Sequence, residues 1–151
     1  MSITIQQATI NSLETLYQIE RECFTAEAFS KEHIAYLLEN SNAVSLVAKI
    51  NNAIAGFVIG LIHSHDEKIA GRVYTLDVAV EYRRKGVGLK LLDEIERIFA
   101  ERGVKICRLE ARRDNVAALE LYRKNGYVKV EELEDYYEGA HGVRLEKKLG
   151  V

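Results

Sequence analysis

Apolar residues recur along this chain with two different spacings, and the spacings predict two kinds of element. Alternating, apolar or β-branched runs predict seven strands, at Ile3–Ile5, Ala43–Ile50, Ala53–Ile62, Val73–Val80, Lys105–Arg112, Tyr127–Leu133 and Val143–Leu149. Apolar positions three or four residues apart predict four helices, which begin after Asn11 or Ser12, after Ser30, at Val87 and after Asp114 or Asn115. The order of these elements is typical of a mixed sheet with helices on its faces.

The segments between these elements carry the residues at which helices and strands usually end. Asn51-Asn52 separates two apolar runs and predicts a tight hairpin turn. Arg102-Gly103 and Asn125-Gly126 place a glycine where a helix stops. Three longer segments that lack either spacing are predicted to be loops, namely Phe24–Phe29, His63–Gly71 and Glu134–Gly142.

Length and composition indicate one soluble domain over residues 1–151. The chain is 48% hydrophobic and 29% charged, as ordinary globular proteins are, and it is long enough to bury roughly two thirds of its unfolded surface. A net charge of −2 argues against a dedicated nucleic-acid-binding protein. The longest apolar run, Ala53–Ile62, is too short to span a membrane and contains two glycines.

The two cysteines favour a cytoplasmic protein. Cys23 and Cys107 lie far apart and form no CxxC pair, so they are expected to be free thiols in a reducing compartment. The first residues also lack the charged and then apolar layout of a signal peptide. The four histidines have no metal-ligand spacing with carboxylates or cysteines, and no metal is expected.

The most informative stretch is Val73–Leu92, where a predicted strand passes through a basic turn into a helix. The turn is Arg83–Gly88, with the letters RRKGVG, and it contains three cations and two glycines. A helix start directs unpaired N–H groups and the positive end of the helix dipole at one point, which suits a phosphate or pyrophosphate. Glycine lets the backbone approach such an anion closely. The stretch therefore predicts a site for a phosphate-bearing ligand, although a solvated basic turn explains the hexapeptide alone about equally well.

Three further segments complete a family pattern. The chain resembles the GNAT superfamily of acetyl-CoA-dependent N-acetyltransferases in Arg83–Gly88, which fits Q/R-x-x-G-x-G/A, and in Asn115–Tyr127, which fits N-x-x-A-x-x-L-Y-x-x-x-G-F/Y. Leu109–Arg112 and the tyrosine pair before the last strand resemble the ribosomal-protein-alanine and related protein N-terminal acetyltransferases. One departure is Val80, where members of this family commonly carry proline.

This resemblance implies the GNAT fold, an α/β (α+β) structure with a mixed central sheet of about seven strands and four helices. It also implies acetyl-CoA as cosubstrate, with the pantetheine arm beside the central strand and the acetyl carbonyl on the backbone of Leu76 and Val78. The implied cofactor-binding residues are Leu76, Asp77, Val78, Arg83, Arg84, Lys85, Gly86, Val87, Gly88, Asn115 and Tyr122. Taken alone, the strand residues also suit a core, and Asn115 also suits a helix cap.

Two residues are implied to be catalytic. Glu110 is the expected general base, acting through a water on the incoming ammonium. Tyr122 is the expected general acid, because a phenol with a usual pKa near 10 keeps its proton at neutral pH and can return one to the CoA sulfur. The structural alternatives are an exposed Glu110 paired with Arg108 or Arg112, and a core aromatic at Tyr122.

The acceptor is expected to be the N-terminal α-amino group of a protein or peptide. By resemblance, two loops that border the acceptor groove carry the substrate-binding residues, namely Phe24, Glu27, Phe29, Tyr136 and Tyr137, although ordinary loop packing would also explain them. Two alternatives stay open: acetylation of a small amine such as a polyamine or an amino acid, and a non-catalytic acetyl-CoA-binding module. We expect a monomer or homodimer, without nucleic-acid or membrane partners.

Overall fold

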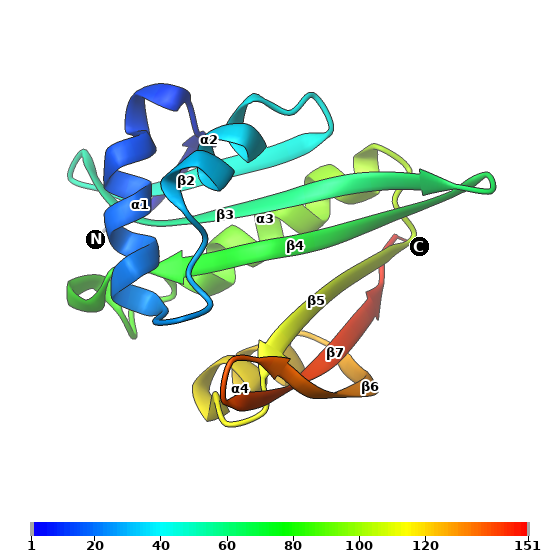
Figure 1. Ribbon diagram of the computed structural model, residues 1–151. Coiled ribbons are helices and arrows are strands. Elements are labelled where there is room, and N and C mark those ends of the chain that lie inside the picture. The colour runs from blue at the N-terminus through cyan, green and yellow to red at the C-terminus, as the bar shows by residue number, and fades with distance from the viewer. Residues whose placement is uncertain (1, 151) are drawn as a thin grey trace.

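Seven strands form one mixed sheet in the computed structural model, which describes residues 2–150 except for the side chain of His65 (Figure 1). The strands are β1 (Thr4–Gln7), β2 (Ala43–Ile50), β3 (Ala53–His65), β4 (Lys68–Val78), β5 (Ile106–Arg112), β6 (Val128–Tyr137) and β7 (Ala140–Lys148). Their order across the sheet is β1-β2-β3-β4-β5-β7-β6. Only β4 and β5 pair in parallel among these neighbours, because a helical crossover connects them.

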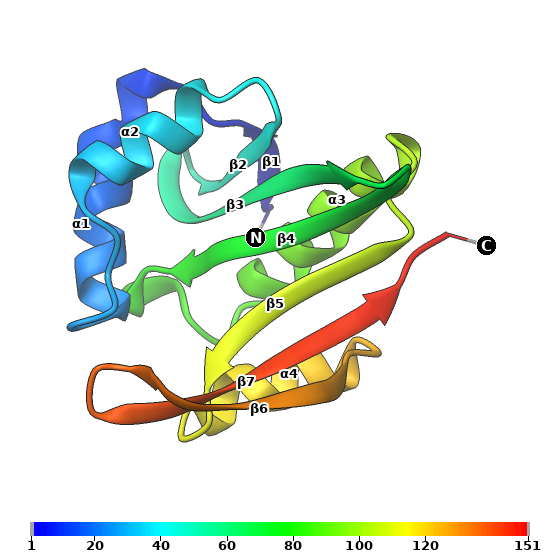
Figure 2. The same cartoon turned by 45° about the vertical axis from the view of Figure 1, so that its right-hand side comes forward.

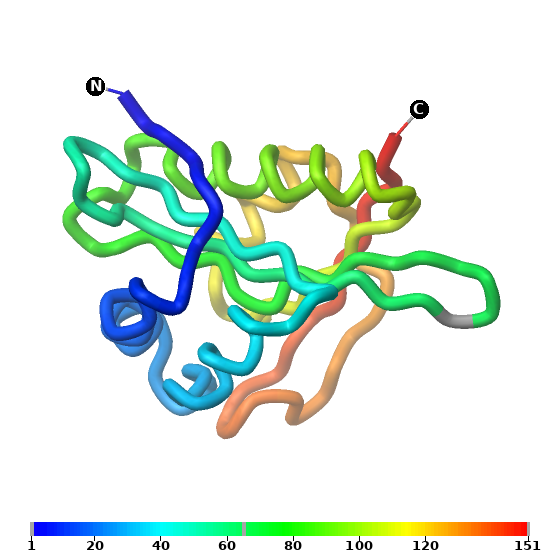
Figure 3. The backbone as a smooth tube through the Cα atoms, turned by 90° about the horizontal axis from the view of Figure 1, so that it is seen from above, coloured from blue at the N-terminus to red at the C-terminus, as the bar shows by residue number. Residues whose placement is uncertain are grey.

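Helices cover both faces of the sheet. They are α1 (Leu13–Cys23), α2 (Lys31–Glu39), α3 (Val87–Glu101) and α4 (Val116–Lys124). Figure 3 shows α1 and α2 on one side of the sheet and α3 on the other. The α1 and α2 side buries Leu16, Ile19, Ile34 and Leu37 against Phe57 and its neighbours.

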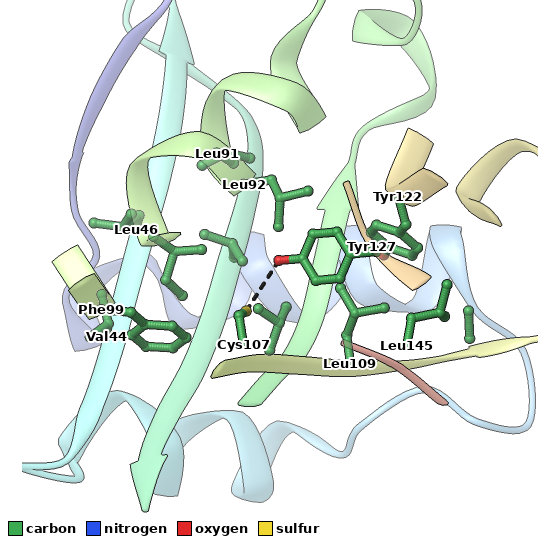
Figure 4. Packing of buried hydrophobic residues seen from close by; sticks show 14 of the residues in the cluster. Val44, Leu46, Leu91, Leu92, Phe99, Cys107, Leu109, Tyr122, Tyr127 and Leu145 are labelled. Carbon is green, nitrogen blue, oxygen red and sulfur yellow. Dashed lines mark hydrogen bonds between the residues drawn. The ribbon is translucent and has the colours of Figure 1, made fainter. Parts of the chain in front are cut away.

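The face opposite α1 and α2 carries the larger core. Leu91, Leu92 and Phe99 of α3 are fully buried there, and Tyr127 packs beside them (Figure 4). The Tyr127 hydroxyl contacts Cys107 Sγ at 3.1 Å and donates to Glu96 at 2.7 Å. This core fixes β4 and α3 relative to each other, and with them the turn that connects the two elements.

The predicted order of strands and helices is confirmed, including two of the capping residues. The Ser30 hydroxyl accepts from the His33 amide at 3.1 Å, and Asn115 Oδ1 accepts from the Ala118 amide at 3.2 Å. Ser12 precedes α1, but its side chain makes no cap hydrogen bond, because Ile10–Ser12 forms a 3-10 turn there. The Asn51-Asn52 hairpin is present, with both residues at positive φ.

Two predicted loops are wrong, because strands continue through them. His63–Gly71 belongs to a long hairpin of β3 and β4 that turns at Asp66-Glu67, both with positive φ, which residues of this type rarely adopt. Glu134–Gly142 is likewise the end of β6, a Glu138-Gly139 turn and the start of β7. The strand predicted to reach Val80 ends two residues earlier, at Val78, and passes into a 3-10 turn.

The strands β4 and β5 separate halfway along their length (Figure 2). Their pairing runs only from Ala70 with Ile106 to Val73 with Leu109, although β4 continues to Val78. The register between β3 and β4 shifts at this level, which leaves Tyr74 as an extra residue on β4. Such a bulge bends and twists a strand, so β4 leaves β5 and opens a gap in the sheet.

Candidate active site

A cavity of about 340 Å³ lies where β4 and β5 separate. Its wall brings together nine residues that the sequence singled out, namely Phe24, Glu27, Phe29, Leu76, Glu110, Asn115, Tyr122, Tyr136 and Tyr137. Four polar or aromatic wall residues were not anticipated, namely Glu20, Arg72, Tyr74 and Thr75. Arg112, the last residue of the Leu109–Arg112 motif, also lines the wall. The cavity thus joins α1, the loop after it, β4, β5, α4 and the end of β6.

Glu110 lies in the cavity wall with both carboxylate oxygens engaged. Arg72 Nε donates to Oε1 at 2.8 Å, and Arg144 Nε donates to Oε2 at 2.9 Å. The side chain is only 5% exposed. Arg108 and Arg112, the partners named in the structural alternative, bind other acids instead. The pairing of Glu110 in that alternative is therefore wrong. The two guanidinium groups hold the carboxylate in one orientation at the point where the strands part.

Tyr122 lies on α4 and lines the same cavity. Burial raises the pKa of its hydroxyl above the ordinary phenol value, with Asp77 and Tyr137 adding to the shift. The ring packs edge-on against Tyr127, with 5.9 Å between ring centroids. Tyr122 therefore keeps its proton at neutral pH, as a general acid must.

The peptide groups of Leu76 and Val78 point into the gap between the strands. The Ala79 amide donates to Ala55 O of the neighbouring segment at 2.8 Å, and alternate residues of a strand direct their peptide groups to opposite edges. Val78 O accordingly accepts from Arg83 Nε at 3.1 Å rather than from β3. The side chain of Asp77 is buried away from the cavity lining.

The turn before α3 leaves the first amides of this helix without a side-chain cap. Gly86 is the residue before the helix, and its φ of +85° is a conformation that favours glycine. A Cβ at Gly86 would meet no protein atom within 4 Å, whereas one at Gly88 would touch Val78 and Leu121 in ordinary contact. Open space, uncapped amides and the exposed side chains of Arg84 and Lys85 suit an anion at this helix start.

Two segments border the cavity on the side away from α3. The loop after α1 is held by the Phe29 amide, which donates to Glu20 Oε2 at 3.0 Å. The tyrosine pair lies at the end of β6 rather than in a loop, and Arg72 donates to the Tyr136 hydroxyl at 3.2 Å. Glu27 forms an ion pair with Arg112 at 3.5 Å. Both predicted borders of the acceptor groove therefore meet at one cavity.

A buried pair of carboxyl groups lies behind this wall. Glu20 of α1 and Asp77 of β4 are each 1% exposed, and both contact the hydroxyl of Thr75. Burial raises the pKa of Asp77 well above its usual range, and the neighbouring Glu20 adds to the shift. In the sequence, this pair is marked only by two acidic residues at positions where the apolar pattern predicts buried residues.

Two further findings concern the part of the chain that the structure describes. Within residues 2–150, no group of three or more His, Cys, Asp or Glu side chains is arranged to hold a metal ion. No helix in the same range is long and apolar enough to cross a membrane.

A split β4–β5 pair, an uncapped basic helix start and a cavity between them agree with the site for a phosphate-bearing ligand that the sequence predicts. The family model described as Acetyltransferase (GNAT) family matches residues 13–127, and the chain belongs to this family. It is an acetyl-CoA-dependent N-acetyltransferase, which removes the non-catalytic module as an alternative.

The known proteins that the chain resembles act on different amines. A spermidine N(1)-acetyltransferase of Thermoplasma acidophilum is 30% identical over 148 residues, covering 87% of this chain and 91% of the relative. The NAA20 catalytic subunit of the N-terminal acetyltransferase B complex of Arabidopsis thaliana is 24% identical, covering 97% and 85%. The crystal structure of the Escherichia coli ribosomal-protein-S18-alanine N-acetyltransferase superposes with a TM-score of 0.86 at 21% identity, covering 99% and 96%.

Proposed function

We propose that this protein transfers an acetyl group from acetyl-CoA to the N-terminal α-amino group of a protein or peptide. The observation that carries this choice is the charge of the cavity wall. Among the described residues of the wall, Glu110 and Glu27 are paired with arginines, and Glu20 accepts from the Thr75 hydroxyl and the Phe29 amide, so the wall offers no unpaired carboxylate. Such a wall suits an acceptor with one amine and a neutral chain behind it better than a molecule with several ammonium groups.

The reaction needs a polarised thioester and three proton transfers. Glu110 first accepts a proton of the ammonium through a water, and the neutral amine then attacks the thioester carbon, so that the C–N bond forms and the C–S bond breaks. Tyr122 gives its proton to the departing thiolate, and the proton that the nitrogen loses as the amide forms restores the Tyr122 hydroxyl. Because an α-amino group has an unperturbed pKa of about 7.7–8.0, the first of these transfers is easy at neutral pH.

The cosubstrate follows from the same geometry. The amides at the start of α3, with Arg83, Arg84 and Lys85, bind the pyrophosphate, and the peptide groups of Leu76 and Val78 bind the acetyl carbonyl and the pantetheine arm. Asn115 and Tyr122 contact the arm from α4. On the acceptor side, Tyr136 and Arg72 can donate hydrogen bonds to the first peptide carbonyls, and Phe24 and Phe29 can pack its side chains.

The test is acetylation of an N-terminal peptide library in competition with spermidine. We expect CoA release and N-terminal acetylation of peptides, with a higher kcat/KM than for spermidine. A chemically acetylated N-terminus serves as the negative control. Turnover of spermidine with no acetylation of any peptide would overturn the proposal.

A polyamine acceptor is the second candidate. It is favoured by the spermidine acetyltransferase that resembles this chain over most of its length. The same competition decides between the two, because a polyamine has no peptide carbonyls for Tyr136 and Arg72. We further propose one domain over residues 1–151 and a cytoplasmic location.

A further inference from the structure

The Thr75 hydroxyl lies between two buried carboxyl groups. Thr75 Oγ1 is 2.7 Å from Glu20 Oε1 and within hydrogen-bonding distance of Asp77 Oδ1. A hydroxyl has one proton, so it can donate to one of these oxygens only. The other short contact requires a proton on a carboxyl group. One proton must therefore be bound by the pair in addition to that of Thr75.

The partners of each carboxyl group place this proton on Asp77. Glu20 accepts from the Phe29 amide through Oε2, and a donor on its second oxygen favours the ionised form. Asp77 Oδ2 has no hydrogen-bond partner among the described residues and is buried. A buried oxygen without a partner costs far less on a neutral carboxyl than on a carboxylate. The chain of donors therefore runs from Asp77 through Thr75 to Glu20.

The other groups around Asp77 leave this assignment intact. Arg83 approaches it from the turn before α3, but donates to Val78 O and Cys23 Sγ instead. Cys23 of α1 and Tyr122 of α4 are the neutral neighbours, and burial raises the pKa of both. No cation binds Asp77 directly within residues 2–150.

We propose that Asp77 is a positioning residue, whose protonated carboxyl fixes the loop of residues 24–29 for the acceptor through Thr75 and Glu20. This rests on the proposed function only in that the loop borders the acceptor side of the cavity. Ionisation of Asp77 would set two carboxylates against one hydroxyl proton. Glu20 would then be repelled from Thr75, and its bond to the Phe29 amide would weaken.

The kinetic test compares the wild type with Asp77→Asn and Asp77→Ala at neutral pH. The amide of asparagine donates to Thr75, as a protonated Asp77 does, whereas alanine cannot. We expect Asp77→Asn to keep the acceptor KM of the wild type and Asp77→Ala to raise it by about tenfold, which corresponds to about 1.4 kcal/mol. An acceptor KM of Asp77→Ala equal to that of the wild type would overturn the proposal.

Thr75→Val is the matched variant that removes the bridge while keeping the side-chain shape. It should raise the acceptor KM at every pH, while the dissociation constant for CoA stays unchanged. An acceptor KM equal to that of the wild type at neutral pH would also overturn the proposal.

A second measurement needs no acceptor. Hydrogen exchange followed by NMR at neutral pH should show the Phe29 amide equally protected in the wild type and in Asp77→Asn, and less protected in Asp77→Ala. The His33 amide, which the Ser30 hydroxyl holds in the next element, is the internal control. If no peptide is acetylated but Phe29 behaves in this way, the proposed acceptor is wrong and the role of Asp77 in the loop stands. Equal protection of the Phe29 amide in Asp77→Ala and in the wild type refutes that role.

Discussion

Arg72 of β4 lies one residue before the last paired residues of β4 and β5 and binds Glu110, one residue beyond them on β5, with 2.8 Å between Nε and Oε1. Arg144 of β7 completes the arrangement from the other side at 2.9 Å. The ion pair spans the point at which the sheet opens, and it sets the position of the carboxylate before any substrate enters. Preorganisation of this kind is what a catalytic group requires, since a loose base loses much of its rate advantage.

Glu110→Gln is expected to lower kcat by roughly 10²-fold, because the amide cannot accept the proton of the ammonium. Binding of CoA should be unchanged, since Glu110 lies on the acceptor side. The matched control is Glu146→Gln. Glu146 pairs with Arg108 between β5 and β7 but lies outside the cavity wall, so this change should leave kcat as it is. Steady-state kinetics and calorimetric CoA titration measure both effects. A fully active Glu110→Gln enzyme would show that another residue is the general base.

The adjacent rings of Tyr122 and Tyr127 allow a reciprocal test. Tyr122→Phe removes the general acid and should reduce kcat by roughly 10²-fold with little effect on the melting temperature. Tyr127→Phe removes a core hydroxyl that contacts Glu96 and Cys107, and should cost about 1–3 kcal/mol of unfolding free energy with little effect on kcat. Each variant is assayed for turnover and thermal unfolding. The two roles would have to be exchanged if Tyr127→Phe proved the inactive one.

Gly86→Ala separates backbone conformation from cofactor binding. Both Gly86 and Gly139 have positive φ, and a Cβ at either position would meet no other atom within 4 Å, so alanine should cost about 1 kcal/mol of stability at each position. Only Gly86 lies at the start of α3, where the pyrophosphate is proposed to bind. CoA affinity, measured by calorimetry, should therefore fall for Gly86→Ala alone. An equal affinity for both variants would place the pyrophosphate away from this glycine.

The order of elements could be predicted because it depends on local signals, whereas the nine of eighteen wall residues that the sequence singled out were implied by the family resemblance. Ser30 and Asn115 are side chains that cap helices, and they do so here. The hairpin within His63–Gly71, which was predicted to be a loop, lacks such a signal at its turn. Asp66-Glu67 turns a hairpin at positive φ without glycine or asparagine, so tertiary pairing of β3 with β4 outweighs local preference there.

The partners of the functional residues could not be predicted, because they come from distant parts of the chain. The structural alternative paired Glu110 with an arginine of its own strand, yet Arg72 and Arg144 reach it from the two neighbouring strands. Glu20 and Asp77 are separated by 57 positions and meet only because α1 packs against β4. Which residue faces which across a sheet depends on register, and a bulge such as that at Tyr74 has no reliable sequence signal.

Asp77→Asn is expected to stabilise the protein, and increasingly so as pH rises. Burial raises the pKa of Asp77 in the folded state above its unfolded value of about 3.9. The contribution of this carboxyl to stability is therefore complete below the unfolded pKa and is lost as pH rises through the folded pKa. Asparagine does not ionise and escapes this loss. The difference in melting temperature between variant and wild type should start near zero in acid, grow with pH and then level off.

Glu20→Gln is expected to destabilise the protein, in contrast to Asp77→Asn. Glu20 accepts two hydrogen bonds, from the Thr75 hydroxyl and from the Phe29 amide, and a glutamine amide would set its NH2 group against one of these donors. The change should cost about 1–3 kcal/mol. Thermal unfolding of the three proteins in a common series of buffers measures both effects. Destabilisation by Asp77→Asn at every pH would show that Asp77 is the ionised member of the pair, because only a carboxylate there would lose charge on substitution.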